Sequence, residues 1–213
     1  MKLTVFGATG GIGGHAVRQA LEAGHTVTAV VRDRARLAIA DHPELRVVTV
    51  PGLSDAEPLE PALRGADAAL SGVGPRSRGD AGITTPATRS ILSALESTGV
   101  RRFVLVSAAP VGPIPEGESV VGRRIFYPLL RRVLRPVYDD LAAVEADLRR
   151  SGTEWTVVRP PKLTDKPLTG RYRTTTGGNV PNGKSIPRAD VAHAMLATLT
   201  DPNTVHQAVG VAT

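Results

Sequence analysis

The chain has 213 residues, a formal net charge of +6 and no cysteine. This length fits one domain, or one domain with a small appendage, and a hydrophobic content of 41% can fill one α/β core. The absence of cysteine excludes disulfides, thiolate catalysis and cysteine-ligated metals. No apolar run is long enough to span a bilayer and no cleavable signal pattern is present, so we expect a cytoplasmic protein.

Composition and spacing disfavour two further kinds of ligand, nucleic acids and metal ions. Aromatic residues make up only 3% of the chain, and the arginines are scattered apart from one cluster, so we expect no nucleic-acid partner. The five histidines show no metal-ligand spacing, so no metal site is predicted.

Short apolar stretches alternate with helical patterns along the chain. Strands are predicted near 2–7, 26–31, 45–50, 67–72, 103–107 and 154–159, with a short last one near 206–211. Helices are predicted near 11–23, 33–40, 55–64, 85–98, 139–151 and 188–200. This alternation indicates an α/β fold with a mostly parallel sheet and helices on both faces. Ligands bind such sheets at the carboxyl ends of the strands, so we expect the chemistry there.

A glycine-rich run at 7–14 joins the first strand to the first helix. Gly7 permits a tight turn, Gly10 lets the backbone approach a pyrophosphate, and Gly13 lets the helix pack close to the sheet. The N–H groups at the start of the helix favour an anion. The run predicts dinucleotide binding on a doubly wound Rossmann sheet with strand order 3-2-1-4-5-6, the alternative being an ordinary glycine-rich loop. Residues 1–213 are then expected to form a single NAD(P)-binding domain.

The end of the second strand discriminates between the two nicotinamide cofactors. Arg32 is the first residue past the strand, and Arg36 lies one turn further along the predicted helix, on the same side. Two guanidinium groups could hold a 2′-phosphate, which favours NADPH. Asp33 argues mildly for NAD, and a solvated helix start is the alternative interpretation.

The ends of the third and fourth strands carry small residues. Gly52 and Leu53 follow the third strand and are expected to pass under the adenine. Gly72, Val73 and Gly74 follow the fourth strand and allow the backbone to approach the middle of the dinucleotide, or form a plain tight turn.

The fifth and sixth strands end in residues suited to the nicotinamide end of the cofactor. Ser107 places a hydroxyl either against a nicotinamide ring or on local backbone. Pro160 and Pro161 fix an extended loop that leads to Lys162 and Leu163. Backbone groups of this loop could bind the nicotinamide carboxamide, and Lys162 would stand beside the substrate or on the surface as a cation.

Two irregular segments, 109–137 and 160–187, follow strand ends and are expected to wall a substrate pocket. Segment 160–187 is expected to be a long loop with one short hairpin. Within segment 109–137, five arginines alternate with apolar residues: Arg123, Arg124, Arg131, Arg132 and Arg135. This stretch could cover an anionic acceptor, pair two subunits, touch an anionic membrane surface, or form an amphipathic helix packed on the core with a solvated basic face.

Four stretches carry a family resemblance: GATGGIG at 7–13, VRDRARL at 31–37, SAA at 107–109 and, above all, EWTVVRPPKLTDKPLTGRYRTT at 154–175. The chain resembles the atypical short-chain dehydrogenase/reductases, in particular the biliverdin IXβ reductase/flavin reductase group and its NmrA-like relatives. The resemblance implies a single Rossmann domain in which NADPH reduces flavins, bilins or quinone-like acceptors.

The resemblance also implies roles for individual residues. It places pyrophosphate contacts at Thr9, Gly10, Gly11 and Ile12, the 2′-phosphate arginines at Arg32 and Arg36, the active-site serine at Ser107, and the nicotinamide-side loop at Pro160, Pro161, Lys162 and Leu163. The chain departs from the flavin reductases at Lys162, where they have histidine, and at Leu53, where they have aspartate. Its segment 110–137 is also longer and more basic.

Together these features predict an NADPH-dependent oxidoreductase that transfers hydride to a planar conjugated acceptor, acting as a monomer or homodimer. The alternative is a non-catalytic, NAD(P)-binding redox sensor of the NmrA-like type. It is supported by the missing Tyr-x-x-x-Lys pair, because Tyr138 is followed four residues later by Ala142. A sugar-nucleotide epimerase is disfavoured because it would need that pair and a larger C-terminal substrate domain.

Overall fold

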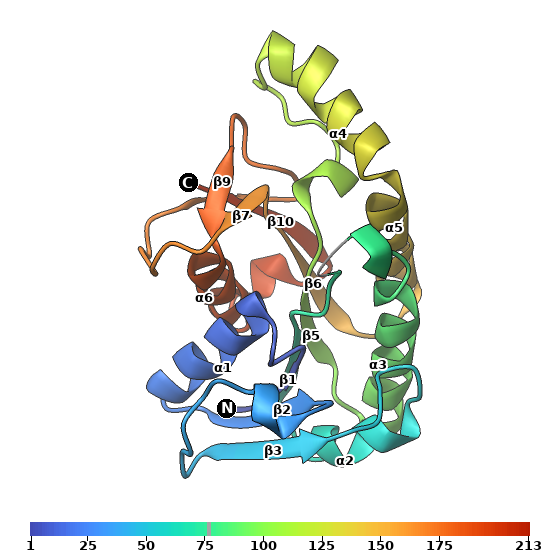
Figure 1. The fold of residues 1–213 in the computed structure, drawn as a ribbon, viewed down its shortest axis with the longest axis vertical. Helices are drawn as coiled ribbons and strands as arrows, with labels where there is room; N and C mark the ends of the chain where they lie inside the picture. The colour runs from blue at the N-terminus through green and yellow to red at the C-terminus, as the bar shows by residue number, and fades with distance from the viewer. Residues whose placement is uncertain (76–77) are drawn as a thin grey trace.

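The structure is a computed structural model that describes residues 1–75 and 78–213, apart from the side chains of Arg78 and Phe126. Its main sheet has the strand order β3-β2-β1-β4-β5-β6-β10-β8 (Figure 1). The strands are β1 Lys2–Phe6, β2 Thr26–Val31, β3 Leu45–Thr49, β4 Ala68–Ser71, β5 Arg102–Val106, β6 Glu154–Arg159, β7 Lys162–Thr164, β8 Arg173–Thr176, β9 Ser185–Pro187 and β10 Gln207–Ala212. The α-helices are α1 Gly11–Glu22, α2 Glu60–Leu63, α3 Thr84–Thr98, α4 Tyr127–Val133, α5 Arg135–Arg150 and α6 Arg188–Thr198.

The predicted doubly wound sheet is confirmed. Strands β1 to β6 are parallel to their neighbours in the order 3-2-1-4-5-6, with Leu3 opposite both Val27 on β2 and Ala68 on β4. The predicted seventh strand is β10, which lies parallel to β6. The sheet then continues one strand further, because β8 pairs antiparallel with β10.

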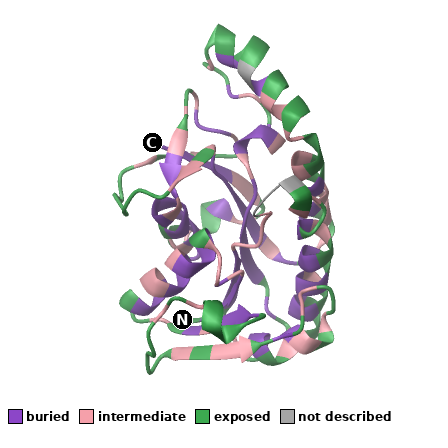
Figure 2. Cartoon of the chain, in the orientation of Figure 1, coloured by how far each residue is buried: buried purple, intermediate pink, exposed green. Residues whose placement is uncertain are grey.

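Helices cover both faces of the sheet (Figure 1). Leu3 and Val5 of β1 belong to one core with α1 and α6, whereas Phe6 belongs to the other core, with α2, α3 and α5. This division follows from the alternation of side chains along a strand. Figure 2 shows the central strands of the sheet and parts of these helices as buried, whereas the edge strand β3 is intermediate to exposed. Because helices cover both faces, a ligand can reach the sheet at the ends of its strands, and the carboxyl ends form the edge called here the carboxyl edge.

Two predicted helices are shorter than expected. The predicted helix at 33–40 is only a 3-10 turn, Arg34–Arg36, capped by the Asp33 carboxylate, which accepts from the N–H of Ala35 at 2.9 Å. Leu37 turns extended, and both Leu37 and Ile39 pack against the α1/α6 core. The predicted helix at 55–64 divides into a 3-10 turn, Glu57–Leu59, and the single-turn α2.

The segment 160–187 does not form the predicted hairpin. Instead β7 pairs parallel with β9 in a separate two-stranded sheet, with Leu163 opposite Ile186. The loop after β7 is attached to α6 through the buried Asp190, whose carboxylate accepts from the N–H groups of Thr169 and Gly170 at 2.9 Å each. The loop is therefore fixed against the helix that follows it.

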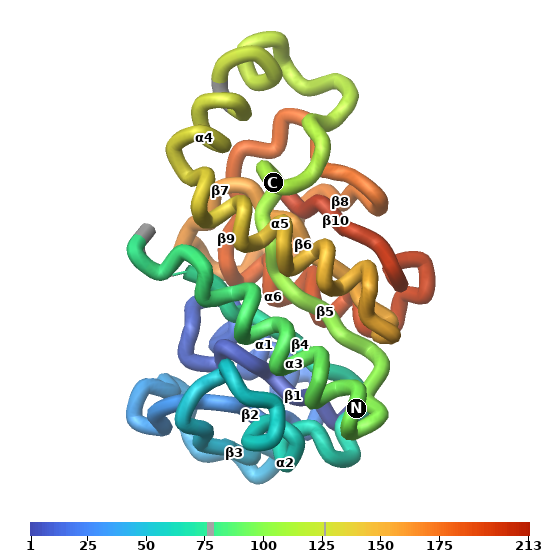
Figure 3. Tube along the Cα trace, turned by 90° about the vertical axis from the view of Figure 1, so that its right-hand side faces the viewer, coloured from blue at the N-terminus to red at the C-terminus, as the bar shows by residue number. Residues whose placement is uncertain are grey.

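The segment 109–137 is largely helical. After a 3-10 turn, Ala109–Val111, and a loop, a π-helical turn, Gly122–Phe126, leads into α4 and then α5. Helix α5 begins at Arg135, a turn before the predicted start at 139. In both views α4 extends beyond the rest of the molecule (Figures 1 and 3). Within the described residues, no helix combines the length and the apolarity needed to cross a bilayer.

Candidate functional site

The turn between β1 and α1 is packed so closely that only glycine fits. Gly7 has a φ of 71°, and a Cβ there would lie 2.8 Å from the carbonyl carbon of Gly72. A Cβ on Gly13 would lie 2.2 Å from the Gly7 carbonyl oxygen, and one on Gly72 would lie 2.8 Å from the Gly13 nitrogen. The N–H of Gly10 donates to the Gly7 oxygen at 2.8 Å and closes the turn. The predicted glycine-rich turn therefore exists in the strand–turn–helix context that dinucleotide binding requires.

The first turn of α1 is suited to an anion. Gly10 is its extended N-cap, and among the described residues no side chain caps the helix there, nor does its first turn carry an acidic residue. The first N–H groups of a helix have no partner within the helix, and they lie at the positive end of its dipole. Thr9 and Gly11 lie at this turn, and Ile12 is buried in the α1/α6 core. Ile12 can therefore offer a ligand only its backbone.

Arg188 is a basic residue at this turn that the sequence analysis did not identify. It is the first residue of α6, and its side chain lies across the start of α1, because a Cβ on Gly11 would fall 2.6 Å from the Arg188 Cδ. Its guanidinium donates to the Asp165 carboxylate at 2.6 Å. The side chain is about one-third exposed, and Asp165 is almost fully exposed. The pair is therefore open enough for Arg188 to exchange Asp165 for another anion.

Arg32 and Arg36 are both exposed beyond the end of β2. They do not share a helical face as predicted, because the chain forms a 3-10 turn between them. Neither makes an ion pair with another described residue, whereas Arg34 binds Asp41 at 2.8 Å. The Asp33 carboxylate is occupied by the capping bond at Ala35. The two guanidinium groups at this strand end thus remain available for an external anion.

Gly52–Leu53 and Gly72–Gly74 follow β3 and β4 at the carboxyl edge of the sheet. Gly52 and Leu53 are half-buried, and Leu53 packs against the core formed with α2, α3 and α5. Gly72 donates its N–H to the Phe6 oxygen at 3.0 Å, and Val73 packs against the same core as Leu53. A Cβ added to Gly74 would meet no described atom within 4 Å, which leaves room beside this backbone.

Ser107 lies directly after β5, with its N–H donating to the Val158 oxygen at 2.9 Å. Its Oγ is buried and has no hydrogen-bond partner among the described residues. The Thr164 hydroxyl, at the end of β7, and the Asn179 side-chain carbonyl oxygen are also buried without a hydrogen-bond partner among the described residues. Buried polar groups are nearly always hydrogen-bonded, so an unpartnered hydroxyl at a strand end points to a ligand or an ordered water.

The segment after β6 packs against the Ser107 region. The Pro160 oxygen accepts from the N–H of Ala109 at 2.9 Å, and Pro161 leads into β7. Leu163 packs against the α1/α6 core. Lys162 is exposed and makes no ion pair with another described residue, so its ammonium group is free to meet an external ligand.

A buried ion pair supports this end of the sheet. Arg159, the last residue of β6, donates through Nε to the Glu145 Oε1 at 2.9 Å and through a terminal nitrogen to Oε2. Both side chains are at least 95% buried, and Arg149 donates to the same carboxylate at 3.0 Å. The bidentate pair fixes α5 to the strand end beside Ser107.

The tyrosines are poor proton donors. Burial raises the pKa of Tyr138 above its ordinary value. Burial and the Asp190 carboxylate together raise the pKa of Tyr172 to about 12, and its hydroxyl lies 2.7 Å from the His193 Nδ1. No phenol described here has the lowered pKa that general-acid catalysis by tyrosine needs.

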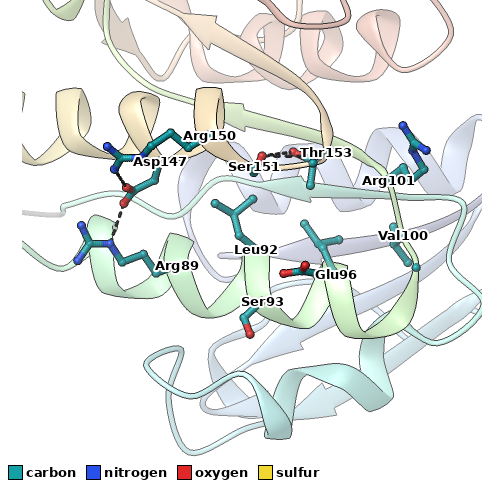
Figure 4. Close-up of a pocket in the computed structure, with 13 residues that line it drawn as sticks. Arg89, Leu92, Ser93, Glu96, Val100, Arg101, Asp147, Arg150, Ser151 and Thr153 are labelled. Atoms are coloured by element: carbon teal, nitrogen blue, oxygen red, sulfur yellow. Dashed lines mark hydrogen bonds and ion pairs between the residues drawn. The ribbon is translucent and has the colours of Figure 1, made fainter.

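A separate cavity of about 580 Å³ lies at the opposite edge of the sheet, between α3, α5 and the starts of β5 and β6 (Figure 4). Its rim holds Asp147, which binds Arg89 at 2.7 Å and Arg150 at 2.5 Å. Open α/β sheets bind ligands at the carboxyl ends of their strands, so the candidate site is the carboxyl edge and not this cavity.

Comparison with known proteins gives a family match over most of the chain. The family model for NAD(P)H-binding proteins matches residues 7–202. An uncharacterised chloroplastic protein of Arabidopsis thaliana is 31% identical over 180 residues, which cover 79% of this chain and 61% of that protein. YhfK of Bacillus subtilis, named as an uncharacterised sugar epimerase, is 25% identical over 215 residues, covering 98% of this chain and 92% of YhfK. The chain thus spans less than two-thirds of the plant relative.

Solved structures share the fold at low identity. A Streptococcus pneumoniae protein named as a candidate NADH-flavin reductase superposes with a TM-score of 0.80 at 23% identity, covering 100% of this chain and 99% of that one. A short-chain dehydrogenase/reductase from Veillonella parvula, in complex with NADP, has a TM-score of 0.80 at 21% identity, covering 100% and 94%. At these identities the likeness establishes the fold alone.

Proposed function

Because the chain belongs to the family of NAD(P)H-binding proteins, we propose that it is an NADPH-dependent reductase acting on a planar conjugated acceptor such as a flavin, a quinone or a bilin. The observation that carries this proposal is one juxtaposition at the carboxyl edge of the sheet. A glycine turn with an uncapped helix start lies after β1, and a buried, unpartnered hydroxyl lies after β5. The cofactor would lie along the edge between them.

The residues at the turn fit the diphosphate of a dinucleotide. Any Cβ at Gly7 or Gly13 would collide with backbone, so the turn stays compact, and the first N–H groups of α1 have no partner within the helix. We assign backbone contacts with the diphosphate to Thr9, Gly10, Gly11 and Ile12. Arg188, which lies over Gly11, would leave Asp165 and donate to the diphosphate.

Preference for NADPH over NADH rests on the two arginines beyond β2. Arg32 and Arg36 have no ion-pair partner among the described residues, and the neighbouring Asp33 carboxylate is turned to a backbone N–H. An arginine pair binds a phosphate dianion through charge-assisted hydrogen bonds. Gly52, Leu53 and the run Gly72–Val73–Gly74 would line the path of the adenosine and the diphosphate.

When bound, the reduced nicotinamide supplies the hydride, which passes to the acceptor. Ser107 would orient the nicotinamide or the acceptor through its Oγ, and Lys162 would stabilise negative charge that develops on the acceptor. Backbone groups of the Pro160–Leu163 segment would hold the carboxamide. The proton would come from solvent. Segments 109–137 and 160–187 would wall the acceptor pocket.

Steady-state oxidation of NADPH tests this function, with FMN, riboflavin, a short-chain quinone and biliverdin as separate acceptors. We expect saturable turnover with at least one of them. Ser107→Ala should lower kcat by about tenfold or more, whereas Ser151→Ala, a hydroxyl at the opposite edge that donates to Leu148, should not change it. If the protein binds NADPH but turns over none of the acceptors, the result would favour the alternative function, a cofactor-sensing regulator.

A further inference from the structure

The stretch of residues 120–134, here called the helical arm, exposes an apolar row to solvent. Val121, Ile125, Leu129 and Val133 recur every four residues and are 65%, 60%, 58% and 47% exposed. Adjacent Val120 is 69% exposed. Contiguous exposed apolar side chains of this kind mark an interaction surface in a folded protein.

The opposite side of the helical arm attaches it to the body. Tyr127 is buried, and Arg131 donates to the Pro110 oxygen at 2.8 Å and to the Gly112 oxygen at 2.6 Å. Tyr127 and Arg131 each lie two residues from a member of the apolar row, which is roughly half a turn around a helix. The arm is therefore held by one face while the apolar row points away from the molecule. Figures 1 and 3 show the backbone of α4 projecting from the body.

The charge of the helical arm indicates which kind of partner the apolar row would bind. Between residues 119 and 138 the chain has five arginines and no acidic residue, against a formal net charge of +6 for the whole protein. The arm itself contains four of these arginines and carries +4, which leaves +2 for the rest of the chain. Arg123, Arg124, Arg132 and Arg135 are exposed, and among the residues that the structure describes only Arg135 of these four makes an ion pair, with Asp139 at 3.3 Å. Arg124 and Arg132 each precede a member of the apolar row by one residue, roughly a quarter of a turn around the helix, so they border it.

We propose that the helical arm docks on an anionic lipid bilayer, with the apolar row in the acyl boundary and the arginines at the headgroups. An interfacial helix has this combination of an apolar face and basic borders. A second copy of the chain fits less well, because antiparallel pairing of two arms would bring their arginine rows together without a counter-charge. The arm follows the loop after β5, so docking would hold the carboxyl edge of the sheet near the membrane.

Flotation with lipid vesicles tests the proposal on the intact protein, without any need for turnover. We expect it to float with vesicles of equimolar phosphatidylcholine and phosphatidylglycerol, to float weakly with pure phosphatidylcholine, and to be released as salt is raised. Ile125→Ser/Leu129→Ser and Arg124→Gln/Arg132→Gln should each weaken binding by about tenfold or more. The substituted residues are exposed, so unchanged circular dichroism and Tm should accompany the loss.

The control carries one change of each kind elsewhere on the surface. Leu168 is 46% exposed, and Arg46 is exposed on β3, so Leu168→Ser/Arg46→Gln should float like the wild type. The proposal is overturned if the wild type does not bind anionic vesicles, or if the arm variants bind as well as the control. It is also overturned if sedimentation shows a dimer that Ile125→Ser/Leu129→Ser dissociates while vesicles remain unbound.

Discussion

Gly13→Ala tests whether the close packing of the β1–α1 turn is needed. The new Cβ would lie 2.2 Å from the Gly7 oxygen and 2.7 Å from its carbonyl carbon, both of them backbone atoms that cannot rotate away. The turn and the helix must separate by about 1 Å, and overpacking of this kind costs roughly 1–3 kcal/mol. The better helix propensity of alanine offsets less than about 1 kcal/mol of this loss of stability. In a domain of this size the net loss should lower Tm by several degrees, on the order of 2–8 °C.

Gly14→Ala is the matched control, because it makes the same change one residue later. Its Cβ would lie 3.3 Å from the Ala8 oxygen, a contact that a shift of a few tenths of an ångström relieves. Thermal unfolding and fluorescence titration with NADPH should show Gly13→Ala less stable and weaker in binding by at least about tenfold, since a 1 Å displacement misplaces the N–H groups. The packing argument fails if both variants behave alike.

Three further substitutions probe the residues around the site. Burial opposes ionisation of Asp140, but hydrogen bonds from Thr85 and Thr84 outweigh it and hold its pKa below the ordinary 3.8. Asp140→Asn should therefore lower the free energy of unfolding in urea by about 2 kcal/mol at neutral pH. This difference from the wild type should shrink as the pH falls through the folded-state pKa, and it would stay constant if the carboxylate were not ionised. Glu145→Gln leaves the Arg159 guanidinium buried without its counter-charge and should lower the free energy of unfolding by about 3 kcal/mol. Glu154→Gln breaks an exposed pair and should lower it by less than about 1 kcal/mol. Equal losses of stability in the two variants would contradict the role of burial. Arg188→Ala should weaken NADPH and NADH alike, by about tenfold, because both carry the diphosphate; loss of one only would exclude that contact.

The sheet was largely predictable from the sequence. The parallel strands are short apolar runs, buried in the centre of the sheet and partly exposed at β3, and β1 to β6 are each found within one or two residues of the predicted ranges. The exception is β8, whose sequence RTTT is polar and mostly exposed, because it lies at the sheet edge and pairs only with β10. Such a strand carries no apolar signal.

The predicted helix at 33–40 fails for a physical reason that local spacing does not reveal. Leu37 and Ile39 are two residues apart and pack on the α1/α6 core, so tertiary packing selects an extended chain over a helix. Arg188 was missed because its proximity to Gly11 arises from the packing of α6 beside α1, which no local motif encodes. The available signal was only that Arg188 begins the predicted helix 188–200, which does not place it beside Gly11.

The basic stretch was expected to be irregular, with an amphipathic helix as one of four alternatives, and the structure shows it as helical. Apolar residues occur on both of its sides, with Tyr127 toward the body and Ile125 and Leu129 toward solvent. The interpretation as an amphipathic helix packed on the core with a solvated basic face is therefore correct only in part, because the outward face is apolar as well as basic.

The most direct test of the proposed cofactor site is the affinity for NADPH and NADH of the wild type and of Arg32→Ala/Arg36→Ala, measured by fluorescence titration. Arg34→Ala is the control, because Arg34 is already paired with Asp41. We predict that the wild type prefers NADPH and that the double variant loses about tenfold or more for NADPH while its affinity for NADH stays unchanged. An equal loss for both cofactors, or no loss for either, would contradict the placement of the 2′-phosphate and of the cofactor along this edge.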